Sequence, residues 1–205
     1  MTKKSKRWII EKKKDHFYLM AKREGYRSRA VYKLKEINLS YKVLRRGAKV
    51  VDLGAAPGGW LQYTAETIGR NGLVIGIDKR EISPLPYGNV KTFQLDVFNE
   101  DVEKLILKEA GSKVDVILSD LSPNITGVWE VDVARNVEMC DRVLEIADNV
   151  LKRNGRLILK ILEGRGSQKI ISKLKRKFSF VKLFRPRATR KRSAEIYAVC
   201  LGFRG

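Results

Sequence analysis

A buried strand that runs into a glycine-rich turn constrains the fold of this chain more than any other segment. Residues 48–53 are apolar except at two positions, which is typical of a short central strand covered on both faces. A helical pattern resumes over residues 61–68, and the turn between the two carries three glycines, Gly54, Gly58 and Gly59. Glycines allow a tight turn, and a helix start presents backbone N–H groups to a ligand. The segment therefore predicts a nucleotide-type binding site at the carboxyl end of a first parallel strand.

Three further predicted strands end in an aspartate. They cover residues 72–78, 89–96 and 114–120, and they close with Asp78, Asp96 and Asp120. The carboxyl ends of parallel strands meet at one edge of a sheet, so the three carboxylates are expected to share a rim. A single aspartate at the end of a strand is often only a helix N-cap. The prediction of a shared rim therefore depends on the occurrence of such an aspartate at three strand ends. Asp78 lies twenty-four residues after Gly54, where doubly wound folds place the acid that binds ribose hydroxyls.

The rest of the chain alternates between helical and strand patterns. Helices are predicted over 15–23, from Ser28 to Ile37, and over 102–109, 131–153 and 167–177, and strands over 156–162, 178–184 and 194–203. Ser28 is the predicted N-cap of its helix, and Asn154 with Gly155 is the predicted stop of the helix before the fifth strand. This alternation predicts an α/β fold with a mostly parallel sheet and helices on both faces. A length of 205 residues suits one domain, with a basic arm and helix over 1–25 and a core over 26–205.

Positive charge is concentrated in two flanks of the sequence. The chain has 43 Lys and Arg against 23 Asp and Glu, a formal net charge of +20. Residues 1–48 hold sixteen basic and four acidic residues, and residues 168–193 hold eleven basic residues and no acidic one. Between them, residues 49–167 hold fifteen basic and eighteen acidic residues. A solubility surface alone would not require this segregation. It favours a polyanionic partner, above all nucleic acid, over an acidic membrane surface or solvated charge.

Several classes of protein are disfavoured. Cys140 and Cys200 lack the paired spacing of zinc sites or disulfide frameworks, so no metal site is expected. His16 is the only histidine, which leaves one candidate base for a Ser-His or Cys-His nucleophile. No apolar run approaches the roughly twenty residues of a membrane span, and the first residues lack the apolar core of a signal peptide. We expect a soluble, cytoplasmic, monomeric protein without a membrane partner.

Basic residues near aromatic ones are the candidates for RNA binding. Arg27 and Arg29 lie at the start of the predicted helix that contains Tyr32 and Lys33, and this mixture suits stacking on bases and pairing with phosphates. Arg187 and Arg190 lie in the basic segment 185–193. Ordinary solvated surfaces on the helix and the loop are the alternative.

Lys160 interrupts an otherwise apolar strand. It could extend from the strand end into water, or it could be a buried functional amine. Glu195 opens the last predicted strand beside a run of cations.

The glycine loop distinguishes between cofactors. The spacing Gly54-x-Ala56-x-Gly58 is not the Gly-x-Gly-x-x-Gly of dinucleotide sites, and Asp52 suits a cationic ligand better than a pyrophosphate. S-adenosylmethionine carries an ammonium, a sulfonium and an adenosine without phosphates. A methyltransferase is therefore favoured over a nicotinamide-dependent enzyme.

With these motifs in their order, the sequence resembles the FtsJ/RrmJ-type ribose 2′-O-methyltransferases that act on large-subunit ribosomal RNA. The most specific stretches are Arg27–Leu34, Asp52–Trp60, Ser119–Asn124 with Gly127, Leu159–Lys160 with Gly164, and Arg192–Tyr197. One departure is Ser122, where many members carry alanine. The resemblance spans nearly the whole chain and implies a Rossmann-like methyltransferase fold with seven strands, the last of them antiparallel.

The resemblance also implies roles for individual residues. The family's catalytic set falls on Lys33, Asp120, Lys160 and Glu195, and its S-adenosylmethionine site falls on Gly58, Trp60, Asp78, Asp96 and Asp120. The loop itself adds Asp52 and Gly54 as candidate cofactor residues. The implied partner is ribosomal RNA or the large ribosomal subunit, and the implied acceptor is a uridine of 23S-type RNA. Members of the family also modify transfer RNA or messenger-RNA caps, so a transfer RNA substrate remains an alternative.

The chemistry needs a base, because a ribose hydroxyl is a poor nucleophile near neutral pH. Lys160 is the candidate base, Asp120 would orient it, and Lys33 with Glu195 would position the ribose. Burial, a nearby sulfonium and Lys33 favour a neutral Lys160, whereas the two carboxylates oppose it. The alternative from another class is a non-catalytic RNA-binding protein with a vestigial methyltransferase fold, although binding alone does not require all four residues.

Overall fold

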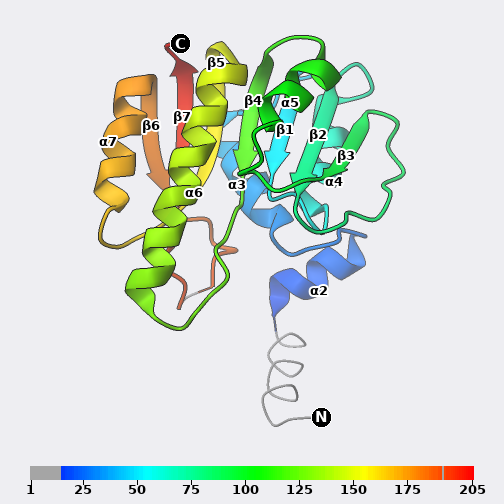
Figure 1. Cartoon of the computed structure of the whole chain (residues 1–205). Coiled ribbons are helices and arrows are strands. Elements are labelled where there is room, and N and C mark those ends of the chain that lie inside the picture. The colour runs from blue at the N-terminus through cyan, green and yellow to red at the C-terminus, as the bar shows by residue number, and fades with distance from the viewer. Residues whose placement is uncertain (1–14, 191) are drawn as a thin grey trace.

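The computed structural model describes residues 15–190 and 192–205, which form a seven-stranded sheet with helices on both sides (Figure 1). The predicted basic arm over 1–14 and Lys191 lie outside the described residues. The strands are β1 (Lys49–Leu53), β2 (Leu73–Asp78), β3 (Val90–Gln94), β4 (Val114–Ser119), β5 (Leu151–Leu162), β6 (Phe178–Phe184) and β7 (Glu195–Phe203). Their order in the sheet is β3-β2-β1-β4-β5-β7-β6.

Strand directions follow the predicted pattern. β1 pairs in parallel with β2 and β4, and the same holds for β2 with β3 and for β4 with β5. β7 lies between β5 and β6 and runs antiparallel to both. The prediction of a mostly parallel sheet with an antiparallel last strand is confirmed. The carboxyl ends of the parallel strands point toward the bottom of Figure 1, where the candidate site lies.

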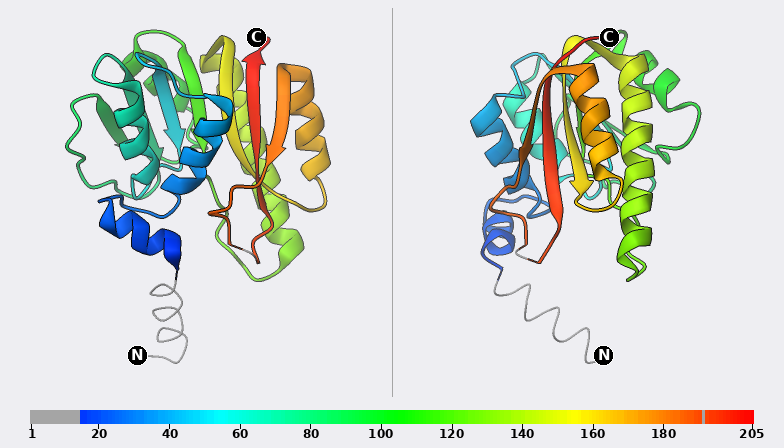
Figure 2. Two further views of the ribbon diagram at one scale, coloured as in Figure 1. Left: turned by 180° about the vertical axis from the view of Figure 1, so that it is seen from behind. Right: turned by 90° about the vertical axis from the view of Figure 1, so that its left-hand side faces the viewer.

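The helices divide between the two faces of the sheet (Figure 2). One face is covered by α5 (Val102–Ala110), α6 (Trp129–Val150) and α7 (Ser167–Lys177), and the other by α3 (Val31–Tyr41) and α4 (Gly59–Ile68). α4 shows how the sequence achieves this, because Leu61, Ala65 and Ile68 recur at helical spacing and are all buried. Gly76 on β2 lets α4 approach, since a Cβ there would lie 2.8 Å from the Leu61 side chain. The short helix α2 (His16–Arg23) lies below the carboxyl edge.

Two predicted helix boundaries are wrong. The helix predicted over 131–153 ends at Val150, because Leu151 already pairs with Val114 of β4 and the next residues form an irregular strand start. Ser28 is not an N-cap. The cap position of α3 is Ala30, without a side-chain hydrogen bond, and Ser28 instead lies so close to α4 that a Cβ on Gly59 would be 2.5 Å from its hydroxyl.

Among residues 15–190 and 192–205, no helix combines the length and the apolar character that crossing a bilayer requires.

Candidate active site

A cavity of about 370 Å³ opens at the carboxyl edge of the sheet, beside the glycine loop. Gly54 and the three carboxylates Asp78, Asp96 and Asp120 line it, and so do three cations, Lys79, Arg80 and Lys160. Gly54 has a φ of +82°, and a Cβ there would lie 2.9 Å from the side chain of Leu121. A larger residue at position 54 would therefore be strained and would crowd this cavity. We call it the acidic cavity.

Asp78 also organises the glycine loop. Its Oδ2 accepts a hydrogen bond from the backbone N–H of Ala56 at 2.9 Å, and its Oδ1 accepts one from the N–H of Arg80 at 2.8 Å. Asp78 thus lines the cavity and at the same time holds the glycine loop through the backbone of Ala56.

Three residues that the sequence assigned to the cofactor are not among the residues that line the cavity. Gly58 caps α4 with a φ of +106°, next to the Arg27 side chain. Trp60 is buried, and its indole Nε1 donates to the carbonyl oxygen of Ala30 at 2.8 Å, which fastens α4 to α3. Asp52 is the next-to-last residue of β1.

Asp52 is nevertheless unusual. Its side chain is almost fully buried, at 1% exposed, and neither carboxylate oxygen has a hydrogen-bond partner among the described residues. Burial, followed by the negative charges of Asp120 and Asp78, raises the pKa of Asp52 well above its ordinary value. Such a carboxylate would be stabilised by a cationic ligand in its vicinity.

Lys160 is buried at the end of the acidic cavity that faces β5. Its side chain is 4% exposed, so the alternative in which it extends into water is wrong. The ammonium Nζ donates to the backbone oxygen of Asp120 at 2.7 Å and lies 3.1 Å from Asp120 Oδ1. The parallel pairing of β4 with β5 explains this contact, since Ser119 lies opposite Leu159.

Tyr197 connects this pair to the other predicted catalytic residues. Its hydroxyl donates to Asp120 Oδ1 at 2.6 Å and accepts from Lys33 Nζ at 2.9 Å. Lys33 Nζ also donates to Glu195 Oε2 at 2.8 Å. Five side chains therefore form one continuous polar network in the order Glu195, Lys33, Tyr197, Asp120, Lys160.

The surroundings of the network favour an ionised Asp120 and a protonated Tyr197. Burial would raise the pKa of Asp120, but the charges of Lys160 and Lys33 and the hydrogen bonds from Tyr197 and Lys160 outweigh it, so this pKa lies below its ordinary value. Burial and then the carboxylates of Asp120 and Glu195 raise the pKa of Tyr197 well above its ordinary value. Tyr197 is therefore a protonated donor to an ionised Asp120.

Sequence reasoning did not assign Tyr197 to the site. Tyr197 is the last residue of the family-like stretch Arg192–Tyr197, and two signals point to it. Glu195 and Tyr197 are two residues apart on one strand, so they share a face of the sheet. In the antiparallel pairing of β5 with β7, Tyr197 lies directly opposite Lys160.

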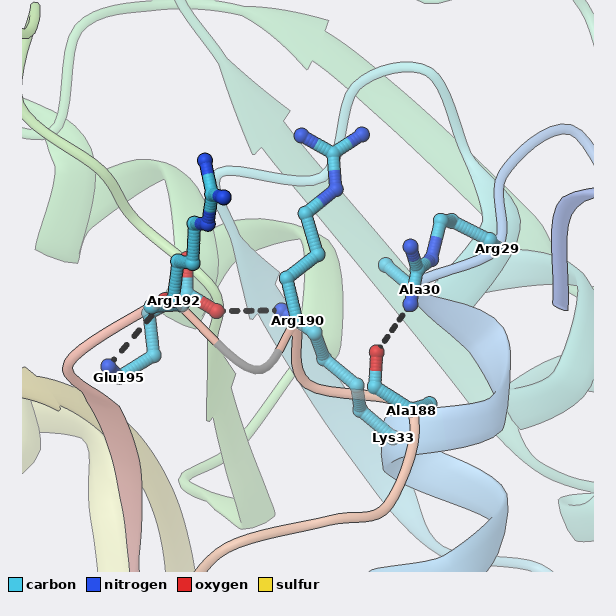
Figure 3. A pocket seen from close by; sticks show the side chains of 8 residues that line it. Arg29, Ala30, Lys33, Ala188, Arg190, Arg192 and Glu195 are labelled. Atoms are coloured by element: carbon cyan, nitrogen blue, oxygen red, sulfur yellow. Dashed lines mark hydrogen bonds and ion pairs between the residues drawn. The ribbon is translucent and has the colours of Figure 1, made fainter. Parts of the chain in front are cut away.

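A second cavity, of about 400 Å³, lies at the other end of the network (Figure 3). We call it the basic cavity, because four cations and one carboxylate line it, namely Arg29, Lys33, Arg190, Arg192 and Glu195. In Figure 3 the side chains of Arg190 and Arg192 extend in the same direction from the loop before β7. Neither guanidinium group has a hydrogen-bond partner among the described residues, which leaves both available to a ligand.

The four arginines predicted to bind RNA occupy different places. Arg29 lines the basic cavity, where Asp15 and the backbone oxygen of Ala188 hold its guanidinium group, and Arg190 lines it without such partners. Arg187 is outside the cavity, 87% exposed, and pairs with Glu36 at 3.2 Å. Arg27 donates to three backbone carbonyls, those of Pro57, Ser83 and Pro84, and so fixes the loops around the cofactor side.

The two cavities are thus joined rather than merely adjacent. Lys33 and Glu195 line the basic cavity, Asp120 and Lys160 line the acidic one, and the Tyr197 hydroxyl bonds to both pairs. The polar network therefore runs from one cavity to the other without a break.

Comparisons with known proteins agree with this geometry. The profile of the FtsJ-like methyltransferase family matches residues 26–203. A protein of Methanosphaera stadtmanae named "Ribosomal RNA large subunit methyltransferase E" is 43% identical, over 97% of this chain and 98% of its own length. A protein of the same name from Methanothermobacter thermautotrophicus is 40% identical, over 98% and 95%.

A solved structure from Plasmodium falciparum, described provisionally as a ribosomal RNA methyltransferase, superposes with a TM-score of 0.77. It shares 29% sequence identity, and the match covers 88% of this chain and all of that one. With a family profile that spans the described fold and relatives that align over almost their whole length, the chain belongs to the FtsJ-like methyltransferase family.

Proposed function

We propose that this protein transfers a methyl group from S-adenosylmethionine to a ribose 2′-hydroxyl of RNA. The observation that carries the proposal is the polar network from Glu195 to Lys160, because it joins a cavity rich in carboxylates to a cavity rich in arginines. A positively charged methyl donor suits the first cavity, and the phosphates of a nucleic acid suit the second.

The residues of the acidic cavity fit the proposed cofactor. Asp78 and Asp96 offer carboxylate oxygens to ribose hydroxyls at the ends of β2 and β3, and Gly54 leaves room beside them. The unpartnered carboxyl group of Asp52, whose pKa is raised by burial and by the charges of Asp120 and Asp78, would ionise more readily once an ammonium or sulfonium binds nearby. When bound, S-adenosylmethionine supplies an electrophilic methyl group. Gly58 and Trp60 would act indirectly, by holding α4 and its loop in place.

The basic cavity fits a nucleotide with its flanking phosphates. Within residues 15–190 and 192–205 the guanidinium groups of Arg190 and Arg192 have no partner, and this group is the one best suited to bidentate phosphate binding. The relatives named for large-subunit ribosomal RNA make that RNA the favoured substrate. The family resemblance of the sequence motifs implies a uridine as the acceptor.

Lys160 is the proposed general base. It must first be neutral, because an ammonium cannot accept a proton. A neutral Lys160 would take the proton of the 2′-hydroxyl and so make that oxygen a better nucleophile, and the ionised Asp120 would stabilise the ammonium that forms. Lys33, held by Glu195 and Tyr197, is placed to bind the ribose on the side of the basic cavity.

The test is methyl transfer from radiolabelled S-adenosylmethionine to large-subunit ribosomal RNA from cells that lack the protein, with mapping of the 2′-O-methyl positions. A transfer RNA pool assayed in parallel tests the alternative substrate. Labelling of one ribose in the large-subunit RNA is expected. Absence of cofactor binding in a calorimetric titration would instead favour a non-catalytic RNA-binding protein.

A further inference from the structure

A second cluster of cations lies at the opposite edge of the sheet, where the parallel strands begin (top of Figure 1). It surrounds a cavity of about 400 Å³ and contains Arg45, Arg46, Lys152, Arg153 and Arg156, with Asp115 as the one carboxylate of the lining. We call it the amino-edge cluster. Neither the proposed cofactor site nor the proposed acceptor site uses any of these residues.

Two irregular backbone segments build this cluster. Arg45 and Arg46 come from the connection between α3 and β1, which turns at Gly47 with a φ of +74°. The others come from the start of β5, where the pairing with β4 moves from Leu151 opposite Val114 to Arg156 opposite Val116. This step is five positions on β5 and two on β4, so three extra residues are inserted. Bulges of this kind redirect side chains, and here they direct cations to the sheet edge.

The side chains of three of the five cations form no hydrogen bond or ion pair with any residue that the structure describes. Arg156 donates to the backbone oxygens of Lys42 and Val43, both at 2.7 Å, and Lys152 pairs with Asp115 at 2.6 Å. Arg45, Arg46 and Arg153 are exposed, and their guanidinium groups have no partner among the described residues. The cluster therefore combines two cations that are held by partners with three guanidinium groups that have no partner among the described residues and can bind phosphate.

The like charges interact unfavourably in the free protein. Burial and then the positive charge of Arg45 lower the pKa of the Arg156 guanidinium group. A solvated surface would separate such charges, whereas a bound anion would compensate them.

The cluster is too far from the proposed chemistry to hold the acceptor nucleotide. Arg156 and Lys160 are four residues apart on β5, about 13 Å along an extended strand, and they lie toward opposite edges of the sheet. An anion bound at the amino edge therefore belongs to another part of the ligand.

We infer that the amino-edge cluster is a second docking surface, which binds backbone phosphates of an RNA segment remote from the methylated nucleotide. The inference rests on the proposed function in one respect only, the choice of RNA as the ligand. A large folded RNA can contact both edges of the molecule at once, whereas a short strand at the active site cannot.

The test is a triple variant, Arg45→Ala, Arg46→Ala and Arg153→Ala, which removes only the exposed cations. Binding to a fluorescein-labelled large-subunit ribosomal RNA transcript is measured by anisotropy at several salt concentrations. We expect an affinity about tenfold lower at low salt and a salt slope smaller by about 2 to 3, since each lost phosphate contact removes about 0.7 to 0.9. Methylation of a short oligonucleotide that contains the acceptor site should not change.

A matched variant on α7 controls for net charge. Lys169, Lys175 and Arg176 are also exposed cations without side-chain partners among the described residues, and changing them to alanine should leave affinity and slope near those of the wild type. The inference would be overturned if both variants lost RNA affinity equally or if neither lost any. It would also be overturned if the amino-edge variant lost binding to phosphatidylserine vesicles while its RNA binding stayed intact. Melting temperatures and cofactor titration verify that each variant folds. Because this readout is binding, it remains interpretable if the wild type shows no methyl transfer.

Discussion

The acidic cavity and the basic cavity are built in opposite ways. The acidic cavity is formed by the ends of buried parallel strands, and its carboxylates are held by backbone N–H groups and buried neighbours. The basic cavity is formed by the start of α3 and the loop before β7, and two of its arginines are held by nothing in the described chain. A fixed site suits a small cofactor of constant shape, whereas arginines without partners among the described residues can turn to the phosphates of a polymer.

Changing Lys160 to alanine should have the largest effect, because it removes the group proposed to take the proton. We expect the single-turnover rate of methyl transfer to fall by about 10²- to 10⁴-fold. Cofactor affinity, measured by calorimetry, should change little. Lys173→Ala is the control, since Lys173 pairs with Asp141 on the outer surface. Near-normal turnover of the Lys160 variant would remove this residue from the mechanism.

Changing Arg190 and Arg192 together to alanine should affect the basic cavity alone. We expect RNA affinity to fall by about tenfold or more and the salt slope to fall by about 1 to 2, with the rate at saturating RNA preserved. Arg187→Ala is the matched comparison from the same loop. Because Arg187 pairs with Glu36 outside the cavity, its loss should have a smaller effect. An equal effect would show that the whole loop, rather than the cavity, attracts RNA.

Asp52→Asn tests the acidic cavity. The cofactor should bind about tenfold more weakly, as expected for a lost interaction with a charged group. The pKa of Asp52 is raised in the folded protein, so its contribution to stability is present below the unfolded pKa, about 4, and is lost as pH rises through the folded value. The free variant should therefore melt at a higher temperature than the wild type at pH 7. Equal melting temperatures at pH 7 and unchanged cofactor binding would contradict this role.

Tyr197→Phe should have the smallest effect of the four, because it removes one hydroxyl and keeps the ring. The free energy of unfolding should fall by about 1 kcal/mol in denaturant titrations. The variant also removes the hydroxyl that connects Lys33 to Asp120. Turnover should therefore fall, while the affinities for cofactor and RNA stay near normal. A loss of RNA affinity instead would place Tyr197 in substrate binding.

The sequence predicted the fold better than it predicted the contacts of single residues. The α/β class with its mostly parallel sheet follows from the alternation of helical and strand patterns, and the carboxylate rim follows from the aspartates at the ends of three predicted strands, because both are local signals. The end of α6 could not be read from Asn154 and Gly155, since the pairing of Leu151 with Val114 competes with the helix and involves a distant segment. Arg27 was assigned to RNA because its charge is visible in sequence, whereas the three carbonyls that bind it come from two other loops.

The position of β7 between β5 and β6 has a consequence for when the site forms. Lys33, Asp120 and Lys160 precede β7 in the chain, so synthesis delivers them first. Glu195 and Tyr197, which link Lys33 to Asp120, arrive with the strand that also joins β6 to the rest of the sheet. A nascent chain that has not yet inserted β7 therefore has neither a closed sheet nor a continuous network. The strand that connects β6 to the rest of the sheet is thus the same strand that connects the two halves of the proposed catalytic group.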